Sequence, residues 1–153
     1  MGLDMFLMKE TYIGAGYEFN EVKGTVDVTK QGESIPINLN RISTITEEVG
    51  YWRKANHIHN WFVQNVQGGR DECQRAYVSK EDLEKLLSIC KEVLADHSKA
   101  PELLPTTEGF FFGGTDYDEY YFQDVQDTIN IIEPLLKELE ENSMGDVYYQ
   151  SSW

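Results

Sequence analysis

The sequence has few basic residues, few cysteines and no long apolar run. Lys and Arg number 13 against 27 Asp and Glu, so the formal net charge is −14 at pH 7. A field of this sign repels phosphate backbones, which argues against direct nucleic-acid binding. Without 18 consecutive apolar residues we expect no membrane span, and MGLDMFLMKE lacks the features of a secretory signal. We therefore expect a cytoplasmic protein.

Motifs that identify enzymes are also missing. Cys73 and Cys90 are 17 positions apart with no CxxC, which is typical of two reduced thiols. The sequence has no phosphate-binding P-loop and no dinucleotide fingerprint, and no nucleophile elbow surrounds a serine. His57-x-His59 does not have the i, i+4 spacing of a helical zinc pair. The sequence therefore favours a non-catalytic protein.

The residues that are present predict one α+β domain over residues 1–153. Apolar residues make up 41% of the chain and aromatic residues 12%, enough for a core of its own. Alternating and β-branched patterns predict an antiparallel sheet of about four to six strands. The strand patterns cover 5–13, 22–29, 35–39, 41–49 and 146–153, with a turn at 30–33. Apolar stripes at steps of three and four predict three helices, at about 52–66, 80–95 and 116–141.

The segment GYWRKANHIHNWF, residues 50–62, combines aromatic and basic side chains. On a helical wheel its apolar residues and His59 share a core face, so we expect His59 to be buried and hydrogen-bonded. The opposite face would present Arg53, His57 and Trp61, with Lys54 beside them. Either another element covers this face or it binds a ligand, with Trp61 stacking on a base and Arg53 or Lys54 contacting phosphate.

The segment LLPTTEGFFFGGTDYDEYYFQD, residues 103–124, gathers aromatic, glycine and acidic residues. Strand alternation would put Phe110 and Phe112 on one face, with Thr115 opening the following helix after Gly113-Gly114. The acids Asp116 and Asp118 at this turn disfavour a bare phosphate and favour Mg²⁺ or a hydrogen-bonding ligand. The alternative is an aromatic core followed by a capped helix.

Three stretches carry a resemblance to a protein family, namely EEVGYWRKANHIHNWFVQNVQGG, LLPTTEGFFFGGTDYDEYYFQD and VYYQSSW. They resemble small proteins found in bacteriophages and mobile elements of gut bacteria, over most of the chain. Members are sometimes labelled phosphoglycerate kinase, which this sequence contradicts by its length and by its lack of a doubly wound two-domain pattern. The resemblance implies an origin in which small acidic proteins without enzymatic activity disarm host defence.

Three functions follow as hypotheses. The first is a protein that sequesters a nucleotide-derived immune signal, using Arg53, Lys54, His57, Trp61, Phe110, Phe112 and Thr115, with or without homo-oligomerisation. The second is an acidic inhibitor of a basic host protein, such as a DNA mimic, using the helix at 116–141; residues 116–146 hold ten acids against Lys137 alone. The third is a metal-dependent phosphoester or nucleotide hydrolase, with Asp116, Asp118 and Glu119 as metal ligands and His57 as base.

Overall fold

The fold is built around strand β1 (Asp4–Tyr12), in which buried and half-buried residues alternate. The computed structural model describes residues 2–15, 17–19 and 27–153. β1 pairs antiparallel with β4 (Thr44–Arg53) on one side and β6 (Asp146–Ser152) on the other, and β5 (Ala76–Val78) pairs with β6. The resulting order is β4–β1–β6–β5, which confirms the α+β class with an antiparallel sheet.

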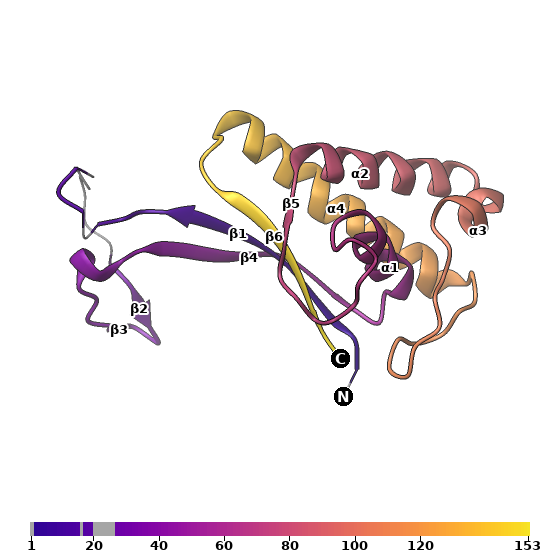
Figure 1. Cartoon of the computed structure of the whole chain (residues 1–153), viewed down its shortest axis with the longest axis horizontal. Helices are drawn as coiled ribbons and strands as arrows, with labels where there is room; N and C mark the ends of the chain where they lie inside the picture. Colours follow the sequence, from indigo (N-terminus) through magenta and orange to yellow (C-terminus); the bar gives the residue numbers. More distant parts are fainter. Residues whose placement is uncertain (1, 16, 20–26) are drawn as a thin grey trace.

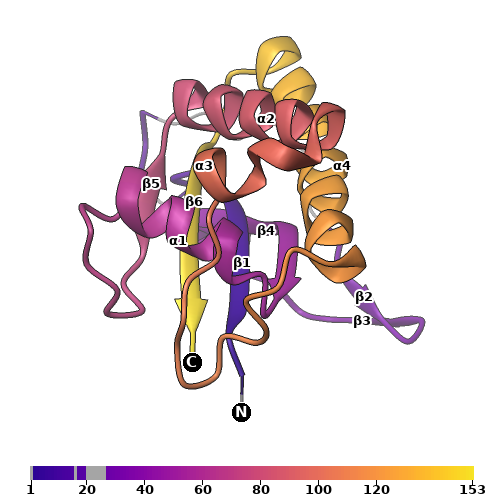
Figure 2. The same cartoon turned by 90° about the vertical axis from the view of Figure 1, so that its right-hand side faces the viewer.

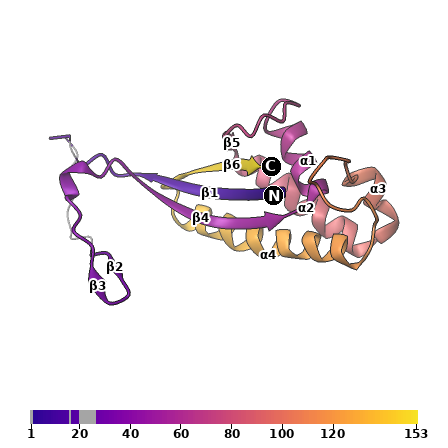
Figure 3. The same ribbon diagram turned by 90° about the horizontal axis from the view of Figure 1, so that it is seen from below.

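The helices occupy one side of this sheet. They are α1 (Asn56–Asn65), α2 (Lys80–Ala95), the short α3 (Ala100–Leu103) and α4 (Glu119–Glu141), with 3₁₀ turns at Leu39–Arg41 and His97–Lys99. Helices α2 and α4 pack against each other over one face of the sheet (Figures 1 and 3). None of the helices within residues 2–15, 17–19 and 27–153 is long and apolar enough to cross a membrane.

Two expected helix starts are wrong. The first helix does not include Trp52 and Arg53, because both belong to β4 and pair with Met5 and Asp4 of β1. The last helix is not opened by Thr115. Asp118 is its N-cap, accepting a hydrogen bond from the amide of Tyr121 at 3.0 Å. By contrast α2 has the expected bounds, and Ser79 caps it through a capping box with Asp82.

The region between β1 and β4 differs most from expectation. The turn after Lys30 is confirmed, but it joins only β2 (Thr29–Lys30) and β3 (Glu33–Ser34). The expected return strand at 35–39 is absent, and the expected strand 22–29 lies largely outside the described residues. We call residues 28–46 the arm. It extends from one end of the sheet, away from the helices (Figures 1 and 3), and none of its residues is buried.

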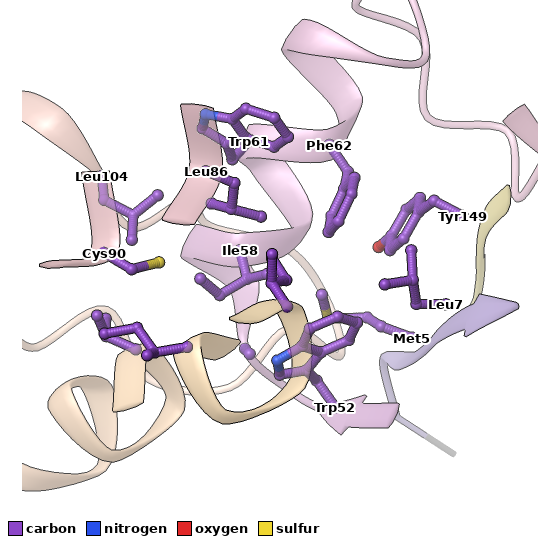
Figure 4. Close-up of a cluster of buried hydrophobic side chains, with 14 of the residues drawn as sticks. Met5, Leu7, Trp52, Ile58, Trp61, Phe62, Leu86, Cys90, Leu104 and Tyr149 are labelled. Atoms are coloured by element: carbon purple, nitrogen blue, oxygen red, sulfur yellow. The ribbon is translucent and has the colours of Figure 1, made fainter. Parts of the chain in front are cut away.

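The core lies between the sheet and the helices (Figure 4). Phe62 of α1 stacks on Tyr149 of β6, with ring centroids 4.0 Å apart and an interplanar angle of 6°. Trp52 is also buried, and its indole Nε1 donates a 2.9 Å hydrogen bond to Thr128 Oγ1 of α4. Residues from the strands and from all four helices thus share one apolar cluster.

Candidate functional site

A tight junction between β4 and α1 positions two cationic side chains. β4 ends at Arg53, and Lys54 then adopts a left-handed conformation with φ of +61°. The amide of Lys54 donates to the carbonyl of Leu3 at 2.8 Å, which fixes this junction to the start of β1. Both Arg53 and Lys54 remain exposed. Arg53 has one loose ion pair, with Asp4 at 3.8 Å, so its guanidinium retains free donors.

Asn56 fastens the segment between α3 and α4 to this junction. Its side chain is 1% exposed and uses both its amide and its oxygen. Nδ2 donates to the carbonyls of Phe112 at 3.1 Å and Gly114 at 2.7 Å, and Oδ1 accepts from the amide of Thr107 at 3.0 Å. Three hydrogen bonds from one buried side chain hold the loop in place. Figure 2 shows this segment running beside both ends of the chain.

The loop approaches so closely that one glycine is required. Gly113 has φ of +88°, a conformation that L side chains rarely adopt. A Cβ built there would lie 3.1 Å from Cβ of Lys54 and 3.3 Å from its carbonyl oxygen. The glycine therefore allows the loop to pack against Lys54 and to form one wall of a cavity.

His57 is buried with a free polar atom. The side chain is 3% exposed, and its ring centroid lies 4.1 Å from that of Tyr121. Nε2 has no hydrogen-bond partner. Burial lowers the pKa of His57 to about 3, although a backbone hydrogen bond with Tyr121 opposes this, so the imidazole is neutral at pH 7. Leaving such a group unpaired typically costs about 1–3 kcal/mol, and such groups are uncommon in folded proteins.

Acidic and aromatic residues of α4 form the opposite wall. Burial, and then the charges of Asp127 and Asp118, raise the pKa of Asp124 to about 7. Its carboxyl group can therefore accept or donate a hydrogen bond near neutral pH. Burial also raises the pKa of Tyr121, whose hydroxyl donates to the carbonyl of Leu104 at 2.7 Å. Tyr120 is 83% exposed at the rim.

These groups enclose a cavity of about 320 Å³ between the β4–α1 junction, the loop and the start of α4. Its lining consists of two cationic residues, three acids and mostly polar or small neighbours: Arg53, Lys54, Asn56, His57, Thr106, Gly113, Gly114, Asp116, Asp118, Tyr120, Tyr121 and Asp124. Such a volume is at the lower end of the range for small-molecule sites. The cationic side chains of the lining can pair with an anionic group of a ligand, and the carboxyl groups can accept hydrogen bonds from its donors.

The structure brings together only part of the expected site. Arg53, Lys54 and His57 line the cavity, together with the weak metal candidates Asp116 and Asp118. Among the described residues, no group of three or more His, Cys, Asp or Glu side chains is placed to hold a metal ion. Asp118 already serves as the N-cap of α4.

The expected exposure of Trp61 is wrong. Trp61 is 6% exposed and packs edge-to-face on Phe62, with ring centroids 5.4 Å apart. It lines a separate cavity of about 150 Å³ that is closed by Leu104 and its neighbours. The segment that begins at α3 covers this face of α1. Of the two alternatives for that face, which were cover by another element and ligand binding, the first applies to Trp61.

The expected pairing of Phe110 with Phe112 is also wrong. Residues 109–112 form a turn in which the amide of Phe112 donates to the carbonyl of Gly109 at 3.2 Å. Phe112 is therefore 9% exposed, whereas Phe110 is 94% exposed. Phe110 and Thr115 line a neighbouring depression that shares Gly113 with the main cavity.

His59 has the structural role that its position on the wheel predicted. Its Nδ1 lies 2.7 Å from the hydroxyl of Tyr149 and its Nε2 lies 2.9 Å from a carboxylate oxygen of Asp71. Trp153 Nε1 donates to the other oxygen of Asp71 at 3.1 Å. Both ring nitrogens of His59 are thus satisfied, and the network ties α1 to β6 and the C-terminus.

Sequence reasoning missed Asn56, Asp124 and the two tyrosines of α4. Asn56 carried no local signal, because its three partners lie more than 50 positions away. Asp124 belongs to an acid-rich helix, and only burial distinguishes it from its neighbours. Comparisons with protein-family models, with curated proteins and with solved structures each find no match to this chain. What the protein does must therefore be inferred from this cavity and its residues.

Proposed function

We propose that the cavity binds a small nucleotide-type ligand and holds it without converting it. The observation that carries this proposal is the presence of two exposed cations, Arg53 and Lys54, in the wall of a cavity of about 320 Å³ that acids and the buried His57 also line.

The charges of the lining favour a ligand with two chemically different ends. Arg53 and Lys54 at one side suit a phosphate, which Arg can bind through two parallel hydrogen bonds. Asp118 and Asp124 at the other side suit the ring and amino N–H donors of a base. Tyr120 is exposed at the rim and can stack on an aromatic ring. A nucleotide has all three features.

Retention without turnover is favoured by what lines the cavity. Three hydroxyl groups line the cavity, those of Thr106, Tyr120 and Tyr121. Thr106 Oγ1 donates to the carbonyl of Thr115 at 3.0 Å and Tyr121 donates to the carbonyl of Leu104. Neither is hydrogen-bonded to a general base, which an activated nucleophile requires. Cys90 is buried elsewhere, in the core, and burial raises the pKa of its thiol to about 12. The hydrolase hypothesis is therefore less well supported.

The biological setting of this proposal rests on the resemblance to phage and mobile-element proteins. In that setting the ligand would be a nucleotide-derived immune signal of a bacterial host, and binding would withdraw it from its receptor. The acidic-inhibitor hypothesis has weaker support, because carboxylates of α4 form ion pairs within the chain. Glu138 pairs with Lys9, Glu133 with Lys91 and Glu140 with Lys80.

The test is native mass spectrometry of the protein after exposure to a pool of cyclic and linear nucleotides. We expect a retained ligand that is recovered chemically unchanged after heat release. Arg53→Ala should weaken retention by a factor of about ten to a hundred or more, as expected for a lost contact of about 1.5–3 kcal/mol to a charged group. Arg70→Ala is the matched control, since Arg70 is also exposed but does not line the cavity.

Each other outcome has a defined meaning. Recovery of a converted nucleotide would contradict retention without turnover. Absence of any retained nucleotide, or equal losses in Arg53→Ala and Arg70→Ala, would contradict the proposed site.

A further inference from the structure

The arm is an ordered extension with no core of its own. Among residues 28–46 only Val28, Leu39 and Ile42 are even half-buried. Fixing a backbone costs about 1–2 kcal/mol per residue, and an isolated two-stranded hairpin is marginal in water. The paired ends of β1 and β4 hold only the base of the arm, where Lys9 forms an ion pair with Glu47 at 3.5 Å.

Apolar side chains gather on and beside the arm. Ile35, Ile37 and Ile45 of the arm are 40%, 42% and 39% exposed. Next to the arm, Tyr17 and Phe19 are 56% and 78% exposed and stack on each other at 5.2 Å. Exposed apolar side chains that gather in one region are typical of an interaction surface, whereas singly scattered ones are normal.

The surface area of the chain is larger than a compact monomer needs. A monomer of 17.7 kDa is expected to expose about 7,900 Å². This chain exposes 9637 Å², an excess of about 1,700 Å² over that expectation. A stable interface buries about 800 Å² on each partner, so the excess is enough for one.

The charge of the arm favours a second copy of this chain as the partner. Residues 28–46 contain Lys30, Arg41 and one acid, Glu33, a net charge of +1. The remaining residues therefore carry −15, and residues 116–146 alone carry −9. Contact between an arm and the acidic region of another copy would therefore be less repulsive than contact between two acidic surfaces.

We propose that the arm mediates a reciprocal homodimer, in which each arm lies on the acidic region 116–146 of the other copy. A two-fold arrangement uses every contact twice, as in most symmetric dimers. The apolar side chains of the arm then supply the buried area, and Lys30 and Arg41 set the orientation. The inference rests on the arm and not on the proposed ligand, although Asp116, Asp118 and Asp124 of the acidic region also line the cavity.

Sedimentation velocity of the full chain between about 1 and 100 µM tests the proposal, since dimers of standard interface size form in this range or below it. We expect a dimer that dissociates at least about tenfold more readily in the double variant Ile35→Asn/Ile37→Asn, because both apolar contacts are lost in each arm. The matched control is Tyr77→Asn, which removes an apolar side chain that is 57% exposed on the body. A chain that stays monomeric throughout, or a dimer weakened equally by both changes, would overturn the proposal.

A cross-linking experiment tests the orientation. A zero-length carbodiimide reagent, applied to a mixture of ordinary and nitrogen-15-labelled chains, joins an amine to a carboxylate in direct contact. We expect mixed-isotope products that link Lys30 to acids within residues 116–146. Links from Lys30 that occur only within one copy, or an arm occupied only by a different protein, would refute a homodimer of this form.

Discussion

The body of the protein and its arm use the same residue types in opposite ways. Ile132 of α4 is fully buried, whereas Ile37 of the arm is 42% exposed. The body closes its own core between a four-stranded sheet and the helices, and its cavity lies at the β4–α1 junction. Thr44, Ile45 and Thr46 of the arm pair with the end of β1, and none of the residues 28–46 is buried. Stability therefore resides in the body, whereas the arm leaves apolar side chains exposed.

Truncation of apolar side chains should give the largest difference between these regions. Leu86→Ala and Ile132→Ala each remove a fully buried side chain and should lower the free energy of unfolding by about 2–5 kcal/mol. Ile37→Ala should change it by less than about 0.5 kcal/mol, as is usual for exposed positions. Denaturant unfolding at a protein concentration below that at which the proposed dimer forms measures all three. A loss under about 1 kcal/mol for Leu86→Ala would mean that the body is not stabilised by this core.

Removal of an asparagine side chain should show the same contrast at a smaller scale. Asn56→Ala leaves buried backbone groups of the loop without partners and should cost about 1–3 kcal/mol. Asn38→Ala removes an exposed cap of a 3₁₀ turn in the arm, where Oδ1 accepts from the amide of Asn40 at 3.1 Å. That loss should be near 0.5 kcal/mol, at the low end for caps. Equal losses in thermal or denaturant melts would show that the arm is as constrained as the body.

The pH dependence of stability should come from two groups of the body, with opposite signs. Asp124 has its pKa raised from 3.8 to about 7, so its contribution is present at low pH and is lost as the pH rises towards 7. His57 has its pKa lowered from 6.5 to about 3, so its contribution is present above pH 6.5 and is lost as the pH falls towards 3. Between about pH 4 and 6.5 the two effects oppose each other.

Two variants separate these effects. Asp124→Asn should be more stable than the original protein at pH 8 and equally stable near pH 3, because the amide mimics the protonated carboxyl group. His57→Phe should gain stability relative to the original protein as the pH falls from 7 to 4, because it cannot take up a proton in the unfolded state. Melting temperatures between pH 3 and 8 provide the measurement, with exposed Glu33→Gln of the arm as control. A pH profile unchanged in both variants would contradict the burial of these groups.

Local patterns were enough to predict much of the body. The stripe of α2 and its Ser79 capping box depend on neighbours within a few positions, and both are found as expected. The burial of His59 followed from the helical wheel in the same way. The expectations for Trp61 and Phe110 failed because neither wheel nor strand alternation describes what a distant segment covers. The wheel also counted Arg53 as helical, although it lies in β4 and reaches the cavity from there.

The sequence by itself determined the α+β class, the faces of the long helices and the acidic charge, and it singled out Arg53, Lys54 and His57, which line the candidate cavity. These properties follow from composition and from periods of two and 3.6 residues, which act over short distances along the chain. Tertiary structure alone decided that Asn56 would clasp a loop from residues 107–114, that Asp124 would be buried enough to shift its pKa, and that the arm would be left uncovered. Those outcomes depend on which distant segments of the chain pack together and exclude water, and local sequence patterns do not predict such contacts.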